Sequence, residues 1–199
     1  MVAFNASFPP GSFLPVAENF GLIGEIDRWV VPEALRLAAS GRRVHANLSA
    51  ESISNVDLLS LIERDMRETK ADPANVVFEI TETALMTNLE AGEVFAHGLA
   101  ELGCGLALDD FGTGFGSFTY LKSMPFTYLK IAIDFVRDIT SNPASKHLVK
   151  ATVGLARDFG HETIAEGVED AKTLGVLKNY GVDFAQGFHL ARPAPLKNV

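Results

Sequence analysis

The strongest constraint on the fold is an alternation of two apolar patterns along the 199 residues. Six short runs rich in β-branched residues predict strands: RRVHANLS, NVVFEITE, CGLALDD, FTYLKIAI, ETIAEGVE and VDFAQGF. Apolar residues spaced three or four apart predict helices over 17–39, 55–68, 89–102, 145–159 and 171–180. Pro32 indicates either a break or the first turn of a second helix within the first of these segments. Strands that alternate with helices are typical of an α/β fold with parallel strands.

Composition and charge exclude several classes of protein. A hydrophobic content of 47% with 21% charged residues is that of a globular protein with a substantial core. The net charge of -8 argues against a DNA partner, since a general basic field is lacking. Cys104 is the only cysteine, which excludes a disulfide framework and suits a reducing compartment. Because neither a signal peptide nor a membrane segment is recognisable, we expect a cytoplasmic protein.

One polar residue lies near the end of each predicted strand. The six are Asn47, Glu79, Asp109, Lys130, Glu166 and Gln186. Their intervals scatter around the roughly 30 residues of one strand and its crossover helix. In a parallel barrel the carboxyl ends of all strands meet at one face, so these side chains would gather in a single site. For any one position, a polar residue that simply begins a loop is the competing explanation.

The chemistry of this set favours a hard divalent cation. Carboxylate and amide oxygens suit magnesium, manganese or calcium better than zinc or copper. The neighbours Asp109 and Asp110 could each reach a different cation, as in two-metal sites with ions about 3.5 to 4 Å apart. Strand alternation would send them to opposite faces, but at the strand terminus the chain leaves its pleat and both can turn inward. Gly112, Gly114 and Gly116 would let the following loop bend around the site.

Six motifs in order resemble those of the EAL-domain family, the cyclic-di-GMP-specific phosphodiesterases of bacterial signalling. They are NLS (47–49), FEITE (78–82), DDFGTGF (109–115), LKI (129–131), IAEGVE (164–169) and QGFHLARP (186–193). The preceding GSFLPVAENFGLIGEIDRWVV is also similar to the family's sequence, so the resemblance covers nearly the whole chain. It implies a TIM-type (β/α)₈ barrel with one antiparallel strand. It also implies metal-dependent hydrolysis of cyclic di-GMP to the linear dinucleotide.

The resemblance implies roles for the polar residues at the strand ends. Asn47, Glu79 and Asp109 would bind one metal, with Asp109 and Asp110 near a second. Glu166 and Gln186 would complete the shell of metal and water, and Lys130 would lie near the attacking water. Lys130 and Glu166 are the expected catalytic residues. The expected cofactors are Mg²⁺ or Mn²⁺, with calcium inhibiting or substituting.

Four further residues match motif positions outside this set. Glu82 resembles the glutamate that anchors the DFGTG loop, and Glu169, Phe188 and Arg192 fall at the rim of the substrate site. Structural interpretations remain open for three of the matched residues. Glu82 lies in a helix-capping stretch, Glu169 could be a first-turn acid favoured by the helix dipole, and Lys130 could be a surface lysine.

The chain departs from the family pattern at its N-terminus. The name-giving Glu-Ala-Leu segment should precede FPPGSFLPVAE, and the EAL at 33–35 lies inside a helical pattern instead. We therefore expect an incomplete barrel, with about six of eight strands, over residues 12–199 after a remnant N-terminal loop over 1–11. Ala132 and Gly116 are lesser departures, which do not touch the expected metal ligands.

These departures leave two function classes open. The first is a phosphodiesterase that is impaired in this chain, at least about a thousandfold slower than an intact relative through the lost metal ligand and substrate contact. The alternative is a non-catalytic module that binds cyclic di-GMP or a partner protein. A barrel enzyme with another metal-assisted reaction is a weaker third interpretation. The open strand edges predict a homo-oligomer or a partner domain that covers them.

Overall fold

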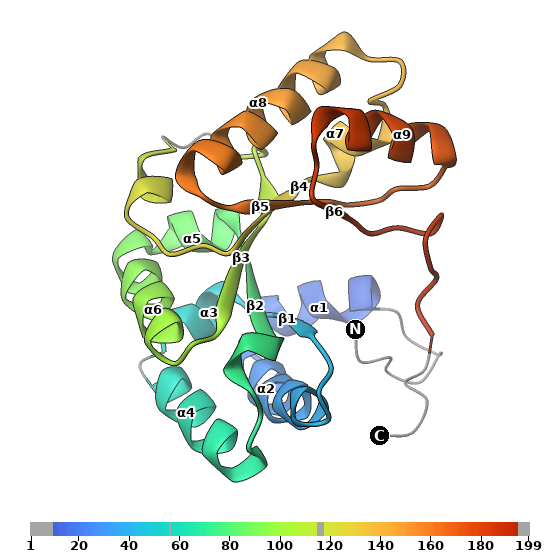
Figure 1. Cartoon of the computed structure of the whole chain (residues 1–199). Coiled ribbons are helices and arrows are strands. Elements are labelled where there is room, and N and C mark those ends of the chain that lie inside the picture. The colour runs from blue at the N-terminus through green and yellow to red at the C-terminus, as the bar shows by residue number, and fades with distance from the viewer. Residues whose placement is uncertain (1–9, 56, 115–117, 195–199) are drawn as a thin grey trace. The chain divides into compact units, whose positions relative to one another are not determined.

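The computed structural model describes residues 10–55, 57–114 and 118–194 (Figure 1). The chain divides into two compact units. Unit 1 comprises Met1–Ile80, Thr87–Gly105 and Pro193–Val199, and unit 2 comprises Thr81–Met86 and Leu106–Arg192.

Unit 1 is built from helices and two parallel strands. In chain order its elements are α1 (Pro10–Asn19), α2 (Ile23–Ala39), β1 (Val44–Asn47), α3 (Ala50–Ile53), α4 (Asp57–Thr69), the 3₁₀ helix η1 (Pro73–Asn75), β2 (Val76–Thr81) and α6 (Leu89–Glu101). Strand β1 pairs with β2 in parallel, and Asn47 is the register partner of Glu79. This register places two of the predicted site residues side by side on adjacent strands.

Unit 2 repeats the alternation of strand and helix. Its elements are α5 (Glu82–Thr87), β3 (Gly105–Phe111), the 3₁₀ helix η2 (Phe118–Lys122), β4 (Tyr128–Ile131), α7 (Ile133–Arg137), α8 (Pro143–Phe159), β5 (Glu162–Ala165), α9 (Ala171–Tyr180) and β6 (Phe184–Ala185). Strands β3, β4, β5 and β6 pair successively in parallel. The carboxyl ends of these strands therefore point the same way.

The predicted α/β class and all six predicted strands are confirmed. Strand β1 is followed by its neighbour β2 in unit 1, and β3 to β6 neighbour one another in sequence order in unit 2. Every observed strand except β3 is shorter than its predicted run, and β6 has only two residues, Phe184 and Ala185. The Glu-Ala-Leu triplet at 33–35 lies within α2, as expected.

The break in the first predicted helical segment lies at Gly21 and not at Pro32. Gly21 has a φ of +66°, and the N–H of Leu22 donates to the carbonyl of Ala17 at 2.8 Å, which ends α1. Helix α2 then runs through Pro32 without interruption. A proline inside a helix costs about 3 kcal/mol, and the buried face of α2, which includes Leu35, offsets that cost.

Short helices are the elements that the sequence pattern missed. Helices α3, α5 and α7 have only four to six residues each, too few to display a helical repeat. Helix α1 begins at Pro10, within the segment 1–11 expected to be a loop. Residues 1–9 of that segment lie outside the described residues.

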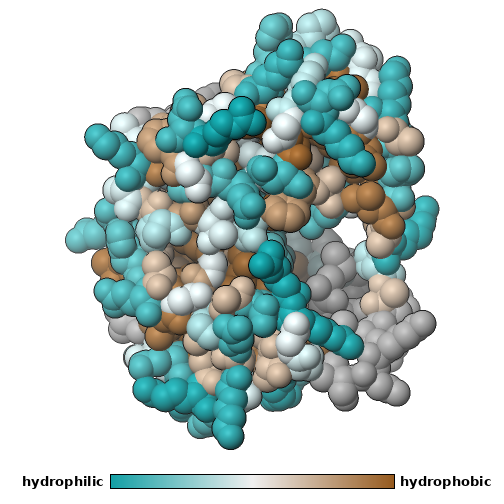
Figure 2. All heavy atoms as spheres, viewed as in Figure 1, coloured by the Kyte–Doolittle hydropathy of each residue, from teal (hydrophilic) through white to brown (hydrophobic). Residues whose placement is uncertain are grey.

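The core of unit 2 lies between its strands and helices α7, α8 and α9. One cluster of buried residues contains Ile131, Val136, Ile139, Val149, Val153, Ala165, Val168 and Leu177. Hydrophilic side chains predominate over α8 in the upper part of Figure 2, as expected for an amphipathic helix with one buried face. Apolar burial therefore holds the strands whose ends carry the predicted site.

The core assignment predicts unequal costs for two leucine truncations in unit 2. Leu177 is 1% exposed in this cluster, whereas Leu148 on α8 is 45% exposed. Leu177→Ala should lower the free energy of unfolding by about 2 to 5 kcal/mol, because it leaves a cavity. Leu148→Ala should change it by no more than about 0.5 kcal/mol. Chemical denaturation of both variants measures the difference, and equal losses would contradict the assigned core.

Candidate functional site

Four predicted site residues of unit 2 lie at the carboxyl ends of adjacent strands. Lys130 is the register partner of Ile164, and Glu166 follows Ile164 by two residues, so both side chains lie on one face. Gln186 continues the same alternation just after β6. Asp109 lies opposite Lys130, where the β3–β4 register becomes irregular. The predicted gathering of strand-end groups is confirmed for this part of the set.

The ammonium group of Lys130 lies between two carboxylates. Its Nζ is 2.9 Å from Asp109 Oδ2 and 2.8 Å from Glu166 Oε1. Lys130 is only 2% exposed, so the interpretation as a surface lysine was wrong. A buried charge is stable only when it is paired, and these two carboxylates account for the burial of the ammonium.

A β-bulge brings Asp109 and Asp110 together. The register of β3 and β4 shifts between Leu108 and Phe111, so that two aspartates oppose the single residue Lys130. Asp110 has a φ of 53°, a left-handed conformation that is uncommon outside glycine, and its N–H donates to Asp109 Oδ1 at 2.8 Å. The aspartates were expected to form the strand terminus, whereas β3 continues one residue further, through Phe111. The bulge, rather than the strand terminus, interrupts the alternation of side chains.

Asp109, Asp110 and Glu166 form a compact acidic group. One carboxylate oxygen of each lies within 4.8 Å of the others. Burial is the main cause that raises the pKa of both Asp110 and Glu166, and the carboxylate of Asp109 adds to the effect. The ammonium of Lys130 opposes the rise at both residues. The single ammonium cannot balance three carboxylates, so this all-oxygen group fits a hard divalent cation.

Gln186 contacts the acidic group through Glu166. Its Nε2 donates a hydrogen bond of 2.5 Å to Glu166 Oε1, the same oxygen that Lys130 contacts. Two donors therefore fix this oxygen. The role of Gln186 as a metal ligand stays a prediction.

Asn47 and Glu79 form a second group, in unit 1. They are register partners on β1 and β2, so their side chains lie on the same face of this strand pair. His45 lies two residues before Asn47, and its Nδ1 is 2.7 Å from Glu79 Oε1. Sequence analysis missed His45, although its spacing from Asn47 along a strand already puts both on one face. The convergence of this group with the acidic group of unit 2 stays a prediction.

Glu82 holds the backbone that follows the two aspartates. Its Oε2 accepts hydrogen bonds from the N–H of Gly112 at 2.9 Å and of Gly114 at 3.3 Å, and its Oε1 accepts one from the hydroxyl of Tyr120 at 2.8 Å. Gly112 has a φ of +91°, which favours glycine there, while Gly116 lies outside the described residues. Burial, with the hydrogen bond to Glu82, raises the pKa of Tyr120 well above its usual value.

Glu82 therefore anchors the described part of the loop, as the motif implied. It is also the first residue of α5 and is fully buried. The sequence did not predict the contact of Tyr120 with Glu82, because Tyr120 follows the glycine-rich motif and belongs to no motif itself.

The three remaining predicted residues are exposed. The Arg192 guanidinium carbon lies 4.8 Å from the ring centroid of Phe188, which is 55% exposed. This cation–π contact joins a ring and a positive charge that a ligand could reach. Glu169 precedes Asp170, the N-cap of α9, so the interpretation of Glu169 as a first-turn acid was wrong.

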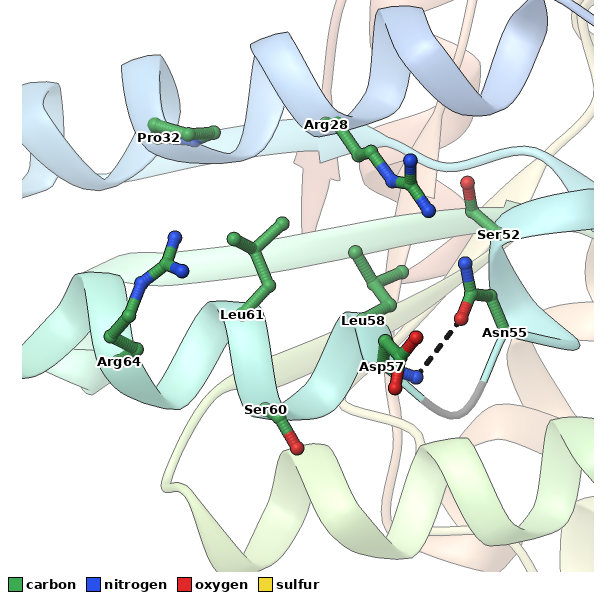
Figure 3. Close-up of a pocket in the computed structure, with 9 residues that line it drawn as sticks. All are labelled: Arg28, Pro32, Ser52, Asn55, Asp57, Leu58, Ser60, Leu61 and Arg64. Carbon is green, nitrogen blue, oxygen red and sulfur yellow. Dashed lines mark hydrogen bonds between the residues drawn. The ribbon is translucent and has the colours of Figure 1, made fainter.

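A hollow of about 510 Å³ lies in unit 1 between α2 and α4 (Figure 3). Arg28 and Arg64 contribute to its lining, and the N–H of Asp57 donates to Asn55 Oδ1 at 2.9 Å on its border. Two nitrogens of Arg64 donate to the neighbouring Asp65 at 2.9 and 2.8 Å. None of the predicted site residues lines this hollow. The candidate site is therefore identified by its strand-end chemistry.

Known proteins are similar to this sequence over most of its length. The chain is 36% identical over 193 residues to the signaling protein YkoW of Bacillus subtilis, covering 94% of this chain and 24% of that protein. It is 34% identical over 193 residues to the cyclic di-GMP phosphodiesterase PdeF of Escherichia coli, covering 94% of this chain and 26% of that protein. The chain thus spans about a quarter of the length of these curated relatives. Among the described residues, no helix has the length and apolar character needed to cross a membrane.

Solved structures share the fold. The PaMucR phosphodiesterase in complex with c-di-GMP matches with a TM-score of 0.89 and 34% identity, covering 95% of this chain and 79% of that one. The FimX EAL domain from Pseudomonas aeruginosa bound to c-di-GMP matches with a TM-score of 0.87 and 28% identity, covering 94% and 77%. These matches confirm the expected TIM-type α/β class.

The family match extends well beyond the six motifs that suggested it. It covers residues 4–193, which include every strand and helix described for both units. Because the match spans nearly the whole chain and is joined by relatives more than 30% identical, the chain belongs to the EAL domain family.

Proposed function

We propose that this chain is a phosphodiesterase domain that hydrolyses one phosphodiester bond of cyclic di-GMP to give the linear dinucleotide. The observation that carries the proposal is the buried ammonium of Lys130 between Asp109 and Glu166, with Asp110 alongside. A phosphodiesterase needs acidic ligands for cations and a positive charge close to the reacting phosphate. The named activity of the relatives PdeF and MucR supports the same substrate.

The proposed cofactor is Mg²⁺ or Mn²⁺. Asn47, Glu79 and Asp109 would hold one ion, and Asp109 with Asp110 would hold a second, while the final positions would come from Glu166 and Gln186. Bound in this way, the ions supply Lewis-acid polarisation of the phosphodiester and an acidified water. Calcium accepts more ligands at longer distances, so we expect it to occupy the same oxygens and to inhibit the reaction or support it poorly.

Lys130 and Glu166 are the proposed catalytic residues. The buried ammonium of Lys130 would orient the attacking water and offset the negative charge that develops on the phosphorane. Glu166 lies against this ammonium, and burial raises its pKa. A carboxylate with a raised pKa is the stronger base, so Glu166 would accept the proton of the water.

The exposed residues would bind the rest of the substrate. The ring of Phe188 presents a flat apolar surface for a guanine base, and the guanidinium of Arg192 beside it would contact a phosphate. Glu169 lies at the same rim in this proposal. Glu82 acts further away, through the loop that it anchors.

The non-catalytic alternative is not favoured. It rested on the expected loss of a metal ligand and a substrate contact that accompany the Glu-Ala-Leu segment, whereas the acidic group and its lysine are present in the chain. Both proposed catalytic residues match the family motifs, Lys130 in LKI and Glu166 in IAEGVE.

Removal of one carboxylate tests the proposed reaction. Asp109→Asn should reduce hydrolysis by at least about 100-fold, because loss of a metal ligand should exceed the 10 to 100-fold effect of outer contacts. Conversion of cyclic di-GMP to linear dinucleotide is followed by chromatography with Mn²⁺ and protein in excess, so that slow turnover is detected. Asp158→Asn on the exposed surface of α8 is the matched control. Full activity of Asp109→Asn, or unchanged activity in EDTA, would overturn the proposal.

Weakening of the loop anchor tests the role of Glu82. Glu82→Gln replaces a charged acceptor of two backbone N–H groups, each such bond contributing about 1.5 to 3 kcal/mol. Hydrogen exchange of the Gly112 and Gly114 amides should therefore accelerate, and hydrolysis should fall about 10-fold or more. Glu90→Gln on α6 is the control, and Tyr120→Phe removes only the third bond. If Glu82→Gln left amide exchange unchanged, the anchor would be excluded.

We also propose that a second copy or a partner domain covers the outer strands. Strand β1 is the first strand of unit 1 and β6 the last strand of unit 2, and Phe184 of β6 is exposed. The DDFGTGF segment is a further candidate contact. Multi-angle light scattering of the purified chain should show a dimer or larger species, with a shift toward monomer in Phe184→Lys. A monodisperse monomer at all concentrations would exclude the homo-oligomer.

A further inference from the structure

A histidine lies against one of the proposed metal ligands. His45 Nδ1 is 2.7 Å from Glu79 Oε1, across the parallel pair of β1 and β2. Glu79 is 5% exposed, while the side chain of His45 is 30% exposed. Asn47, the register partner of Glu79, follows His45 by two residues on the same face. Three groups able to act on a cation therefore share one face within unit 1.

We propose that His45 is a positioning residue, whose Nδ1–H donates to Glu79 Oε1 and directs the other carboxylate oxygen toward the cation held with Asn47. This inference rests on the proposed function, in which Asn47 and Glu79 bind Mg²⁺ or Mn²⁺. It adds a residue that none of the six family motifs contains, since His45 precedes NLS.

The physical reason lies in the burial and freedom of Glu79. A carboxylate out of water needs a donor, because an uncompensated buried charge costs several kcal/mol. A glutamate also has three side-chain torsions, and ordering it adds an entropic cost to cation binding. A hydrogen bond from a neighbouring strand meets both needs at once. Donors to ligating carboxylates act in this way in other metal sites.

Imidazole suits this task better than the other basic side chains. A lysine or arginine would bring a fixed positive charge beside the cation, whereas a neutral imidazole can donate through Nδ1. The ring has few rotamers, and its backbone is fixed in β1 by pairing with β2. The competing role, in which His45 itself binds the cation, is less suited to Mg²⁺ or Mn²⁺, because these ions prefer oxygen ligands.

Three substitutions of His45, to Ala, Asn and Gln, show which ring nitrogen acts. They thereby separate donation from Nδ1 to Glu79 from direct binding of the cation. The amide nitrogen of asparagine occupies the place of Nδ1, whereas that of glutamine occupies the place of Nε2. Mn²⁺ alone is the probe, and its binding is measured from the loss of the electron paramagnetic resonance signal of free Mn²⁺. Glu79→Gln should abolish Mn²⁺ binding at this site. We expect His45→Ala and His45→Gln to lower the affinity of the same site for Mn²⁺ by about 10 to 100-fold. His45→Asn should restore affinity to within about threefold of the unsubstituted chain.

Controls exclude a general effect on folding. Each metal-free variant should give the circular dichroism spectrum of the starting chain at the assay temperature, even where its melting temperature is lower, and His147→Ala on the exposed face of α8 should bind Mn²⁺ normally. His45→Ala with unchanged affinity would overturn the inference. So would recovery in His45→Gln but not in His45→Asn, because the acting atom would then be Nε2. If His45→Ala does not fold, the Asn and Gln pair gives the same decision.

The result also separates this inference from the proposed function. If Asp109→Asn and Glu79→Gln both weaken Mn²⁺ binding and His45→Ala does not, only the role of His45 fails. If neither acidic substitution weakens binding, the proposed metal site fails and the inference fails with it.

Discussion

The buried ion pairs of Lys130 are the interaction on which the rest of the candidate site depends. An ammonium group that is 2% exposed needs both Asp109 and Glu166, which come from the strands on either side of β4. The pairing of β4 with β3 and β5 brings the three side chains together. The same contacts hold two acidic side chains close together, where they would otherwise repel each other. Lys130 thereby stabilises a group of carboxylates that can still accept a divalent cation.

The β-bulge at Asp109 and Asp110 brings the carboxylates of two adjacent strand residues together. In a regular strand, adjacent residues point to opposite faces, and only one aspartate could reach the site. An extra residue opposite Lys130, together with the left-handed backbone of Asp110, brings both carboxylates into one acidic group. Left-handed backbone at a non-glycine residue is uncommon and is found where function requires a particular side-chain direction. The bulge is thus part of the site and not an irregularity of the sheet.

The carboxylates of Glu82, Glu166 and Glu79 are each fixed by donors of a different kind. Glu82 accepts from backbone N–H groups and the hydroxyl of Tyr120, so it holds a loop. Glu166 accepts from Lys130 and Gln186, both on one oxygen. Glu79 accepts from the imidazole of His45. The partners therefore distinguish the glutamate that holds a loop, Glu82, from the two that lie at strand ends, Glu79 and Glu166.

The sequence by itself determined the α/β class, the six strands and the strand-end positions of Asp109, Lys130, Glu166 and Gln186. These follow from local periodicity and from the order of motifs, which are properties of neighbouring residues. Tertiary structure decided the bulge and the contacts of Glu79 and Glu82, because these depend on pairing between segments 20 or more residues apart. It also decided that α2 continues through Pro32, since the buried apolar face of that helix outweighs a local preference against proline.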